Sequence, residues 1–70
     1  MNKEIIEIRD EFITLDNLLK FSGIAETGGE AKLMVIEGYV SLNGEICTQR
    51  KKKIYKGDKI QIDDVEIQVK

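Results

Sequence analysis

The sequence predicts one α+β domain, in which a helix hairpin packs on a small, mainly antiparallel sheet. Two observations carry this prediction. Apolar residues recur at helical spacing between residues 15 and 38, whereas they alternate with polar residues before and after that region. The chain has 70 residues, which is enough for a single domain with a modest core. We therefore treat residues 1–70 as one unit.

The chain opens with a predicted strand and a short helix. Residues 4–9 (EIIEIR) are rich in β-branched side chains, which favours a strand. Residues 15–22 are expected to form a helix, because three leucines fall on one face. Thr14 is a good N-cap residue, and Asp16 lies in the first turn, where a negative charge suits the helix dipole. Gly23 is the expected C-terminal stop.

A second helix is predicted to follow directly. The segment TGGE, residues 27–30, fits the capping box, in which Thr27 accepts a hydrogen bond from the amide of Glu30 while the Glu30 carboxylate reaches back. Gly38 ends this helix. Its apolar stripe consists of Ala31, Met34 and Val35. Two short helices joined by a few residues make an αα-hairpin.

The rest of the chain predicts four strands. Asn43-Gly44 is a strong signal for a two-residue hairpin. Such a loop sets Leu42 opposite Glu45, which mixes apolar and polar side chains on one face, so the register stays open at this stage. Lys-Gly-Asp at residues 56–58 indicates a turn. Asp63 and Asp64 are expected to form the turn of a last hairpin, between a strand with Ile60 and Ile62 and a strand in which Val and Ile alternate over residues 65–69.

The residue types present argue against catalysis and metal binding. The chain has no histidine and a single cysteine, Cys47, so the commonest general base, the commonest metal ligand and any thiolate cage are missing. Asp58, Asp63 and Asp64 are interpreted as turn formers rather than as an acid/base cluster. We expect no enzymatic activity, no metal and no cofactor. Cys47 is interpreted as a small buried thiol.

Hydropathy predicts a soluble protein. The first eleven residues lack the apolar run of a signal peptide, and no segment reaches the roughly 18 apolar residues needed to cross a bilayer. We expect a cytoplasmic monomer without membrane association.

Charge is strongly segregated along the chain. The formal net charge is -2, yet residues 46–60 set six cations against the single Asp58, a net charge of +5. The six cations are Arg50, Lys51, Lys52, Lys53, Lys56 and Lys59. Local potential decides polyanion binding, because exposed charges are screened beyond about 8 Å at physiological salt. This segment indicates either a solvated loop or a nucleic-acid contact.

The stretch ETGGEAK, residues 26–32, is not a nucleotide-binding P-loop. It lacks the longer Gly to Gly-Lys span after a strand and the following Ser or Thr. Gly28 and Gly29 do leave backbone N–H groups open, and without a β-carbon they let a phosphate approach closely. Glu30 opposes this as a negative charge at the same helix end. Capping alone and a phosphate contact beside Lys32 both stay open.

The ordered series of these features resembles the S4-type RNA-binding domain, named after the fourth protein of the small ribosomal subunit. In that family a Leu-Asp pair opens the first helix, a Gly ends it, an Ala and a basic residue lie in the second helix, and a Gly-x-Val-x-Val-Asn-Gly turn leads into a small sheet. The matching residues are Leu15, Asp16, Gly23, Ala31, Lys32, Gly38, Val40, Leu42, Asn43, Gly44, Gly57 and Asp58. The resemblance covers about residues 13–62 and is strongest to short stand-alone bacterial members.

The resemblance implies a fold and a function. The fold is the alpha-L RNA-binding motif. The function is that of a non-catalytic protein that binds structured RNA, either rRNA or tRNA, through backbone charge and shape, with ribosome assembly or translation as its setting. Members present basic side chains from the helices and the adjoining loop. The candidate RNA-binding residues are Lys20, Gly28, Gly29, Lys32, Arg50, Lys51, Lys52, Lys53 and Lys56.

Two departures from the family pattern favour an alternative function. Many members carry a basic residue where this chain has Thr14, and a Ser-Arg pair where it has Thr27, Gly28 and Gly29. Two phosphate contacts are therefore absent. The alternative is a protein-interaction or assembly module whose basic loop docks on an acidic partner or on the ribosomal surface.

The two tyrosines allow two interpretations. Tyr39 and Tyr55 could stack on unpaired bases, as aromatic side chains do in RNA recognition. Packing against the sheet is preferred, because the chain has few large residues from which to build a core.

Overall fold

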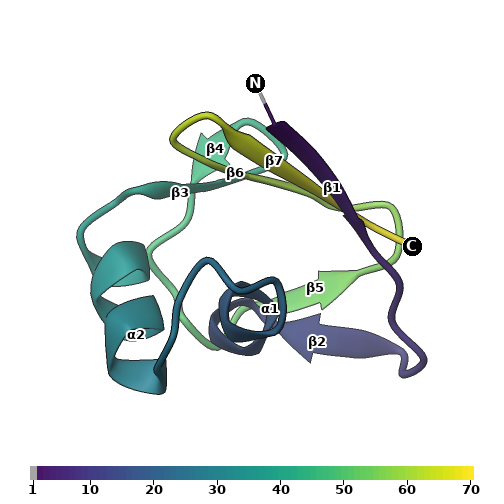
Figure 1. Cartoon of the computed structure of the whole chain (residues 1–70), viewed down its shortest axis with the longest axis horizontal. Coiled ribbons are helices and arrows are strands. Elements are labelled where there is room, and N and C mark those ends of the chain that lie inside the picture. The colour runs from purple at the N-terminus through teal and green to yellow at the C-terminus, as the bar shows by residue number, and fades with distance from the viewer. Residues whose placement is uncertain (1) are drawn as a thin grey trace.

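The computed structural model describes residues 2–70, which form an α+β domain (Figure 1). Its elements are β1 (Asn2–Ile6), β2 (Phe12–Thr14), α1 (Leu15–Phe21), α2 (Gly28–Ile36), β3 (Val40–Leu42), β4 (Glu45–Ile46), β5 (Lys53–Tyr55), β6 (Lys59–Ile62) and β7 (Val65–Val69). The predicted order of one strand, two helices and four strands is confirmed, and the structure adds β2 and β5.

Two sheets and two helices make two layers. The larger sheet has the strand order β1-β7-β6-β3-β4, in which only the β1–β7 pair is parallel. The smaller sheet is the antiparallel pair β2–β5. In Figure 1 the larger sheet lies on one side, and both helices lie with the β2–β5 pair on the other. The prediction of a helix hairpin on a mainly antiparallel sheet is confirmed.

The core joins the helices to both sheets. Its largest fully buried side chains are Leu15, Leu18, Leu19, Val35, Val40, Ile54, Ile60, Ile67 and Val69. Burial of an isoleucine stabilises a fold by about 1.5–3 kcal/mol. Burial of Ile54 therefore holds β5 against the core, and the basic residues directly before β5 are positioned with it.

The first strand differs in its bounds from the predicted residues 4–9. β1 covers Asn2–Ile6 and pairs with β7, which ends at Val69. Ile8 lies beyond the strand but is buried, and its amide donates to the carbonyl of Lys70 at 2.9 Å. The strand ends early because its partner strand ends.

The start of α1 differs from the predicted Thr14 cap. Thr14 is the N-cap residue, but its side chain makes no capping hydrogen bond; the hydroxyl donates instead to Oδ1 of Asp16 at 2.7 Å. The same oxygen accepts from the amide of Asn17 at 2.8 Å. At the other end, Gly23 follows the C-cap with φ +84°, a conformation that glycine adopts without strain.

The capping box of α2 is confirmed in its first half. The amide of Glu30 donates to Oγ1 of Thr27 at 3.1 Å. The Glu30 carboxylate reaches back to the amide of Glu26 at 3.5 Å, one residue before the N-cap. The helix ends at Ile36, and Gly38 follows with φ +82°.

The structure settles the register of the Asn43-Gly44 hairpin. Both turn residues have positive φ, 51° and 91°, as a type I′ turn requires. Leu42 lies opposite Glu45, so the two-residue loop is the correct one. The mixed faces are tolerated because β4 is the edge strand of the sheet and both of its residues are exposed.

Three side chains lie nearer the surface than predicted. Tyr39 and Tyr55 stay outside the core, with exposed fractions of 58% and 43%. Neither tyrosine therefore helps to build the core, which isoleucine, leucine, valine and alanine fill. The Tyr55 ring does pack on the smaller sheet, where it faces Phe12 across the β2–β5 pair. Cys47 is partly buried at the edge of the core rather than fully enclosed.

Candidate nucleic-acid interface

The basic segment, residues 50–59, carries its cations on the surface. Arg50, Lys51, Lys52, Lys53, Lys56 and Lys59 are all exposed. The segment leaves the β3–β4 hairpin, runs past α1 and enters β5 (Figure 1). Its position therefore depends on what holds it against α1.

Backbone hydrogen bonds dock the basic segment on the N-terminus of α1. The amide of Leu15 donates to the carbonyl of Lys52, and the amide of Asp16 donates to the carbonyl of Arg50, both at 2.9 Å. Two N–H groups that a helix leaves unpaired at its start are thus satisfied by the segment itself. The segment is therefore a fixed part of the domain.

A buried carboxylate strengthens this attachment. Asp16 is buried, and its Oδ2 lies 3.0 Å from Nζ of Lys51. Burial alone raises the pKa of Asp16, but hydrogen bonds from the Thr14 hydroxyl, from Lys51 and from the Asn17 amide outweigh burial and hold the pKa below the ordinary 3.8. Asp16 is therefore ionised at neutral pH, and part of the Lys51 charge is balanced inside the protein.

The strand β5 holds the next cation in place. Lys53 was expected on the loop with its neighbours, but it is the first residue of β5 and pairs with Thr14. Its Nζ lies 4.9 Å from the ring centroid of Phe12, within the range of a cation–π contact. Lys56 follows β5 in the turn before β6 and is exposed. The segment thus combines a docked loop with a strand.

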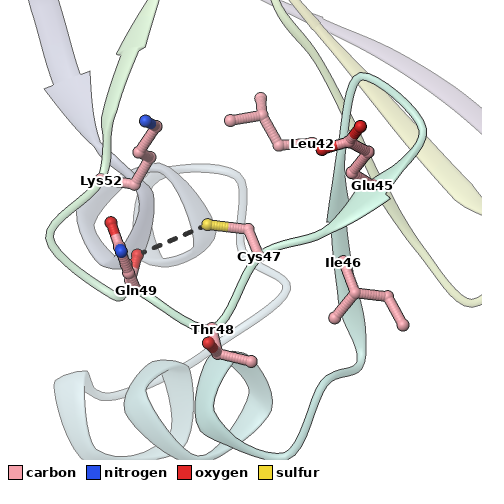
Figure 2. Close-up of a pocket in the computed structure, with 7 residues that line it drawn as sticks. All are labelled: Leu42, Glu45, Ile46, Cys47, Thr48, Gln49 and Lys52. Carbon is pink, nitrogen blue, oxygen red and sulfur yellow. Dashed lines mark hydrogen bonds between the residues drawn. The ribbon is translucent and has the colours of Figure 1, made fainter.

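Three lysines surround one hollow, which we call the lysine hollow. It has a volume of about 460 Å³ and is lined by Leu42, Gln49, Lys51, Lys52, Lys53, Tyr55 and Asp58. A second hollow of about 350 Å³ shares Leu42, Gln49 and Lys52 with it. Figure 2 shows Leu42 and Lys52 facing each other across this second hollow. Because they share these three residues, the two hollows are neighbours between the β3–β4 hairpin and the basic segment, and together we call them the depression.

The helical lysines stand apart from this depression. Lys20 is exposed in the last turn of α1, about 7.5 Å along the helix axis from Leu15 at 1.5 Å per residue. Lys32 is exposed on α2. Neither residue lines the lysine hollow. Of the candidate RNA-binding residues, the lysine hollow therefore brings together Lys51, Lys52 and Lys53.

The N-terminus of α2 is open but already carries an anion. Gly28 and Gly29 are exposed; a β-carbon would meet no atom within 4 Å at Gly28 and only Oγ1 of Thr27, at 3.9 Å, at Gly29. The first intrahelical bond comes from the amide of Ala31 to the carbonyl of Thr27. Glu30 folds back over this end. The geometry gives a phosphate room, and the glutamate opposes its charge.

Two other kinds of site find no support in the described part of the chain. Residues 2–70 contain no group of three or more His, Cys, Asp or Glu side chains that could hold a metal ion. Within the same residues, no helix has the length and apolar character that a membrane span needs.

The chain matches a known protein family over almost its whole length. The sequence pattern of the S4 domain matches residues 6–70. The chain belongs to the S4 domain family. The match takes in both helices, the basic segment and the lysine hollow, so the resemblance noted from the sequence is confirmed over nearly the whole chain.

Curated relatives share most of the S4 domain. A Bacillus subtilis (strain 168) protein named "Probable ribosome maturation protein RlbA" is 38% identical over 58 residues, which cover 83% of this chain and 82% of that protein. An Escherichia coli (strain K12) protein named "Putative RNA-binding protein YbcJ" is 33% identical over 57 residues, 81% of each chain. The similarity thus spans the domain rather than a single motif.

Sequence reasoning missed Gln49, which lines the lysine hollow, and Phe12, which supports Lys53. It singled out Tyr55 as a candidate stacking residue but preferred a packing role for it. The signal that could have found Phe12 is the pairing of two three-residue strands, Phe-Ile-Thr with Lys-Ile-Tyr, whose central isoleucines lie opposite each other. Such strands are too short for a period-2 pattern to stand out.

Proposed function

We propose that this S4 domain is a non-catalytic module that binds structured RNA through the phosphate backbone. The observation that carries the proposal is the basic segment, whose exposed cations are held in a fixed geometry on α1 around a hollow. Phosphate contacts dominate RNA affinity and need positioned lysine or arginine side chains. Family membership and the names of the relatives support the same function.

We further propose ribosomal RNA as the target, in the setting of ribosome maturation. The support is the name of the Bacillus subtilis relative, of which this chain covers 82%. A tRNA target remains the competing proposal within the same class. Both RNAs fold into compact shapes that present phosphates along bent surfaces.

Affinity measured against salt concentration tests the proposal. If three to five phosphates are neutralised, log K falls with log salt at a slope of about -2 to -4. Lys52→Glu plus Lys53→Glu should weaken binding at least tenfold and reduce the slope by about 2. We avoid Lys51 in this test, because a glutamate there would place a carboxylate against Asp16 and disturb the loop itself.

The control reverses the same number of charges elsewhere. Lys3→Glu plus Lys70→Glu changes the net charge by the same amount. Lys3 lies in β1 and Lys70 follows β7, at one edge of the larger sheet, whereas the β3–β4 hairpin forms the opposite edge. This control should keep wild-type affinity within about twofold, since surface charges beyond the Debye length are screened. Lys3 lies 3.9 Å from Glu66 in a surface ion pair, whose loss costs little stability. Equal losses in both variants would show that total charge, not the segment, drives binding.

Further titrations separate the competing partners. An rRNA fragment, a tRNA and a perfect RNA duplex distinguish the target class, and polyglutamate stands in for an acidic protein surface. The proposal expects the rRNA fragment to bind most tightly. Polyglutamate binding as tightly as RNA would instead support the protein-interaction module.

A further inference from the structure

The lysine hollow contains more than cations. Leu42 supplies an apolar surface, Tyr55 an aromatic ring, and Gln49 an amide with both a donor and an acceptor. A site for bare phosphate needs none of these three groups. Its volume of about 460 Å³ lies within the roughly 300–1,000 Å³ of small-molecule sites. The composition fits a ligand with a flat ring, polar ring edges and an attached phosphate.

Tyr55 is held in place through its ring and through its backbone. Across the β2–β5 pair it faces Phe12, with the ring centroids 6.1 Å apart. Its backbone amide donates to Oδ2 of Asp58 at 2.8 Å. The ring nevertheless stays 43% exposed. An aromatic face fixed in this way can stack on a base at little further cost in conformational entropy.

The loop that carries Gln49 is also fixed. Its carbonyl accepts from the amide of Lys52 at 3.1 Å and from the Cys47 thiol at 3.8 Å (Figure 2). Both bonds use the backbone carbonyl of Gln49 and leave its side chain free of them. The side chain is exposed at the wall of the hollow, where its amide can read the edge of a base.

The charge of the hollow suits one phosphate group. Lys51 is engaged with Asp16, which leaves the exposed Lys52 and Lys53 on the rim. The one carboxylate in the hollow, Asp58, has both oxygens in hydrogen bonds, from the Asn43 side chain at 3.1 Å and from the Tyr55 amide. These donors offset its charge in part, so the rim remains cationic.

Cations continue along the chain on both sides of the hollow. Arg50 precedes its three lysines and Lys56 follows Tyr55, and both are exposed. A free mononucleotide bound in the hollow would bring no phosphate group to either of these cations. A nucleotide inside a polymer brings phosphates on either side.

We propose that the lysine hollow binds one unpaired nucleotide of a structured RNA, with the base against Tyr55 and Gln49 and its phosphate at Lys52 and Lys53. The proposal rests on the proposed function and adds to it a preference for RNA that exposes an unstacked base. Backbone contacts along the basic segment hold the RNA. The hollow then distinguishes a bulged or looped strand from a perfect duplex.

Two RNA duplexes test this preference. One is perfectly paired, and the other has the same sequence with a single bulged 2-aminopurine, whose fluorescence reports stacking. The wild-type protein should bind the bulged duplex about fivefold more tightly or better, the lower end of the effect of stacking one base on an aromatic side chain. The 2-aminopurine fluorescence should change on binding.

Matched variants locate the effect. Tyr55→Leu removes the ring but keeps the backbone amide that Asp58 holds, and it should abolish the preference while retaining affinity for the paired duplex. Tyr39→Leu is the control, because Tyr39 is equally a surface tyrosine but does not line the hollow. Gln49→Ala, on an exposed loop, gives a second variant that does not alter the β2–β5 pair. Circular dichroism confirms that each variant is folded.

The outcomes separate this inference from the function on which it rests. Salt-dependent binding of equal strength to both duplexes would overturn the nucleotide site and leave the proposed RNA binding intact. Absence of salt-dependent binding to either duplex would overturn both. Free AMP that binds as tightly as the bulged duplex, and competes with it, would assign the hollow to a mononucleotide and overturn the RNA-embedded site.

Discussion

Asp16 is the residue that links fold and interface most closely. It is buried at the start of α1, accepts hydrogen bonds from Thr14 and Asn17, and forms an ion pair with Lys51. A buried carboxylate costs free energy unless it is paired and hydrogen-bonded. Here the partners come from the helix and from the basic segment, so one side chain stabilises both.

Asp16 predicts a specific acid sensitivity. Its folded-state pKa lies below 3.8, so the unfolded chain binds more protons at acidic pH, and stability rises with pH through this range. The stabilisation is complete above about pH 5 and is lost as pH falls below 3.8 through the folded pKa. Asp16→Asn should lower the free energy of unfolding by about 1–3 kcal/mol at pH 7. Urea unfolding between pH 2 and 7 measures this.

The control for Asp16 is an exposed aspartate. Asp64→Asn changes the same charge in the β6–β7 turn and should leave the curve of stability against pH nearly unchanged. If Asp16→Asn gave the same curve as the wild type between pH 2 and 5, the role assigned to this carboxylate would be wrong.

At the scale of elements, the N-terminus of α2 differs from that of α1. The start of α1 is covered by carbonyls of the basic segment, whereas the start of α2 is open around Gly28 and Gly29 and faces the Glu30 carboxylate. A helix N-terminus favours an anion. Because Glu30 already supplies one, we interpret this end as a capping structure that makes no phosphate contact.

Substitution of the two glycines distinguishes capping from phosphate binding. Gly28→Ala plus Gly29→Ala should stabilise the domain by up to about 1 kcal/mol, because alanine loses less backbone entropy in a helix and space is available for both methyl groups. RNA affinity should stay within about twofold of wild type. A tenfold loss of affinity in the stabilised variant would restore these glycines to the interface, since only a close approach to their backbone explains it.

For the whole molecule, the sequence predicts well where a pattern is long and local. The three leucines of α1 and the capping box at Thr27 mark both helices, and the family resemblance extends over residues 13–62. The β2–β5 pair was not predictable, because each strand has three residues and the pairing joins distant parts of the chain. The hairpin register needed the tertiary context that makes β4 an edge strand.

The candidate site was predictable in part for the same reason. The run Arg50 to Lys53 is visible in the sequence as a local charge excess. Its docking through Asp16, and the addition of Tyr55 to its rim, depend on contacts between segments that are separate in the chain. Lys20 and Lys32 show the opposite case: the family pattern groups them with the segment, while the fold places them outside the lysine hollow.

The central claim is that the basic segment is the surface that contacts RNA. Amide chemical shifts of the ¹⁵N-labelled protein, followed during addition of a structured rRNA fragment, test it most directly. The account predicts that the largest shifts occur at residues 49–56 and in the first turn of α1, which the segment contacts. Largest shifts on β1 and β7, with residues 49–56 unmoved at saturating RNA, would contradict it.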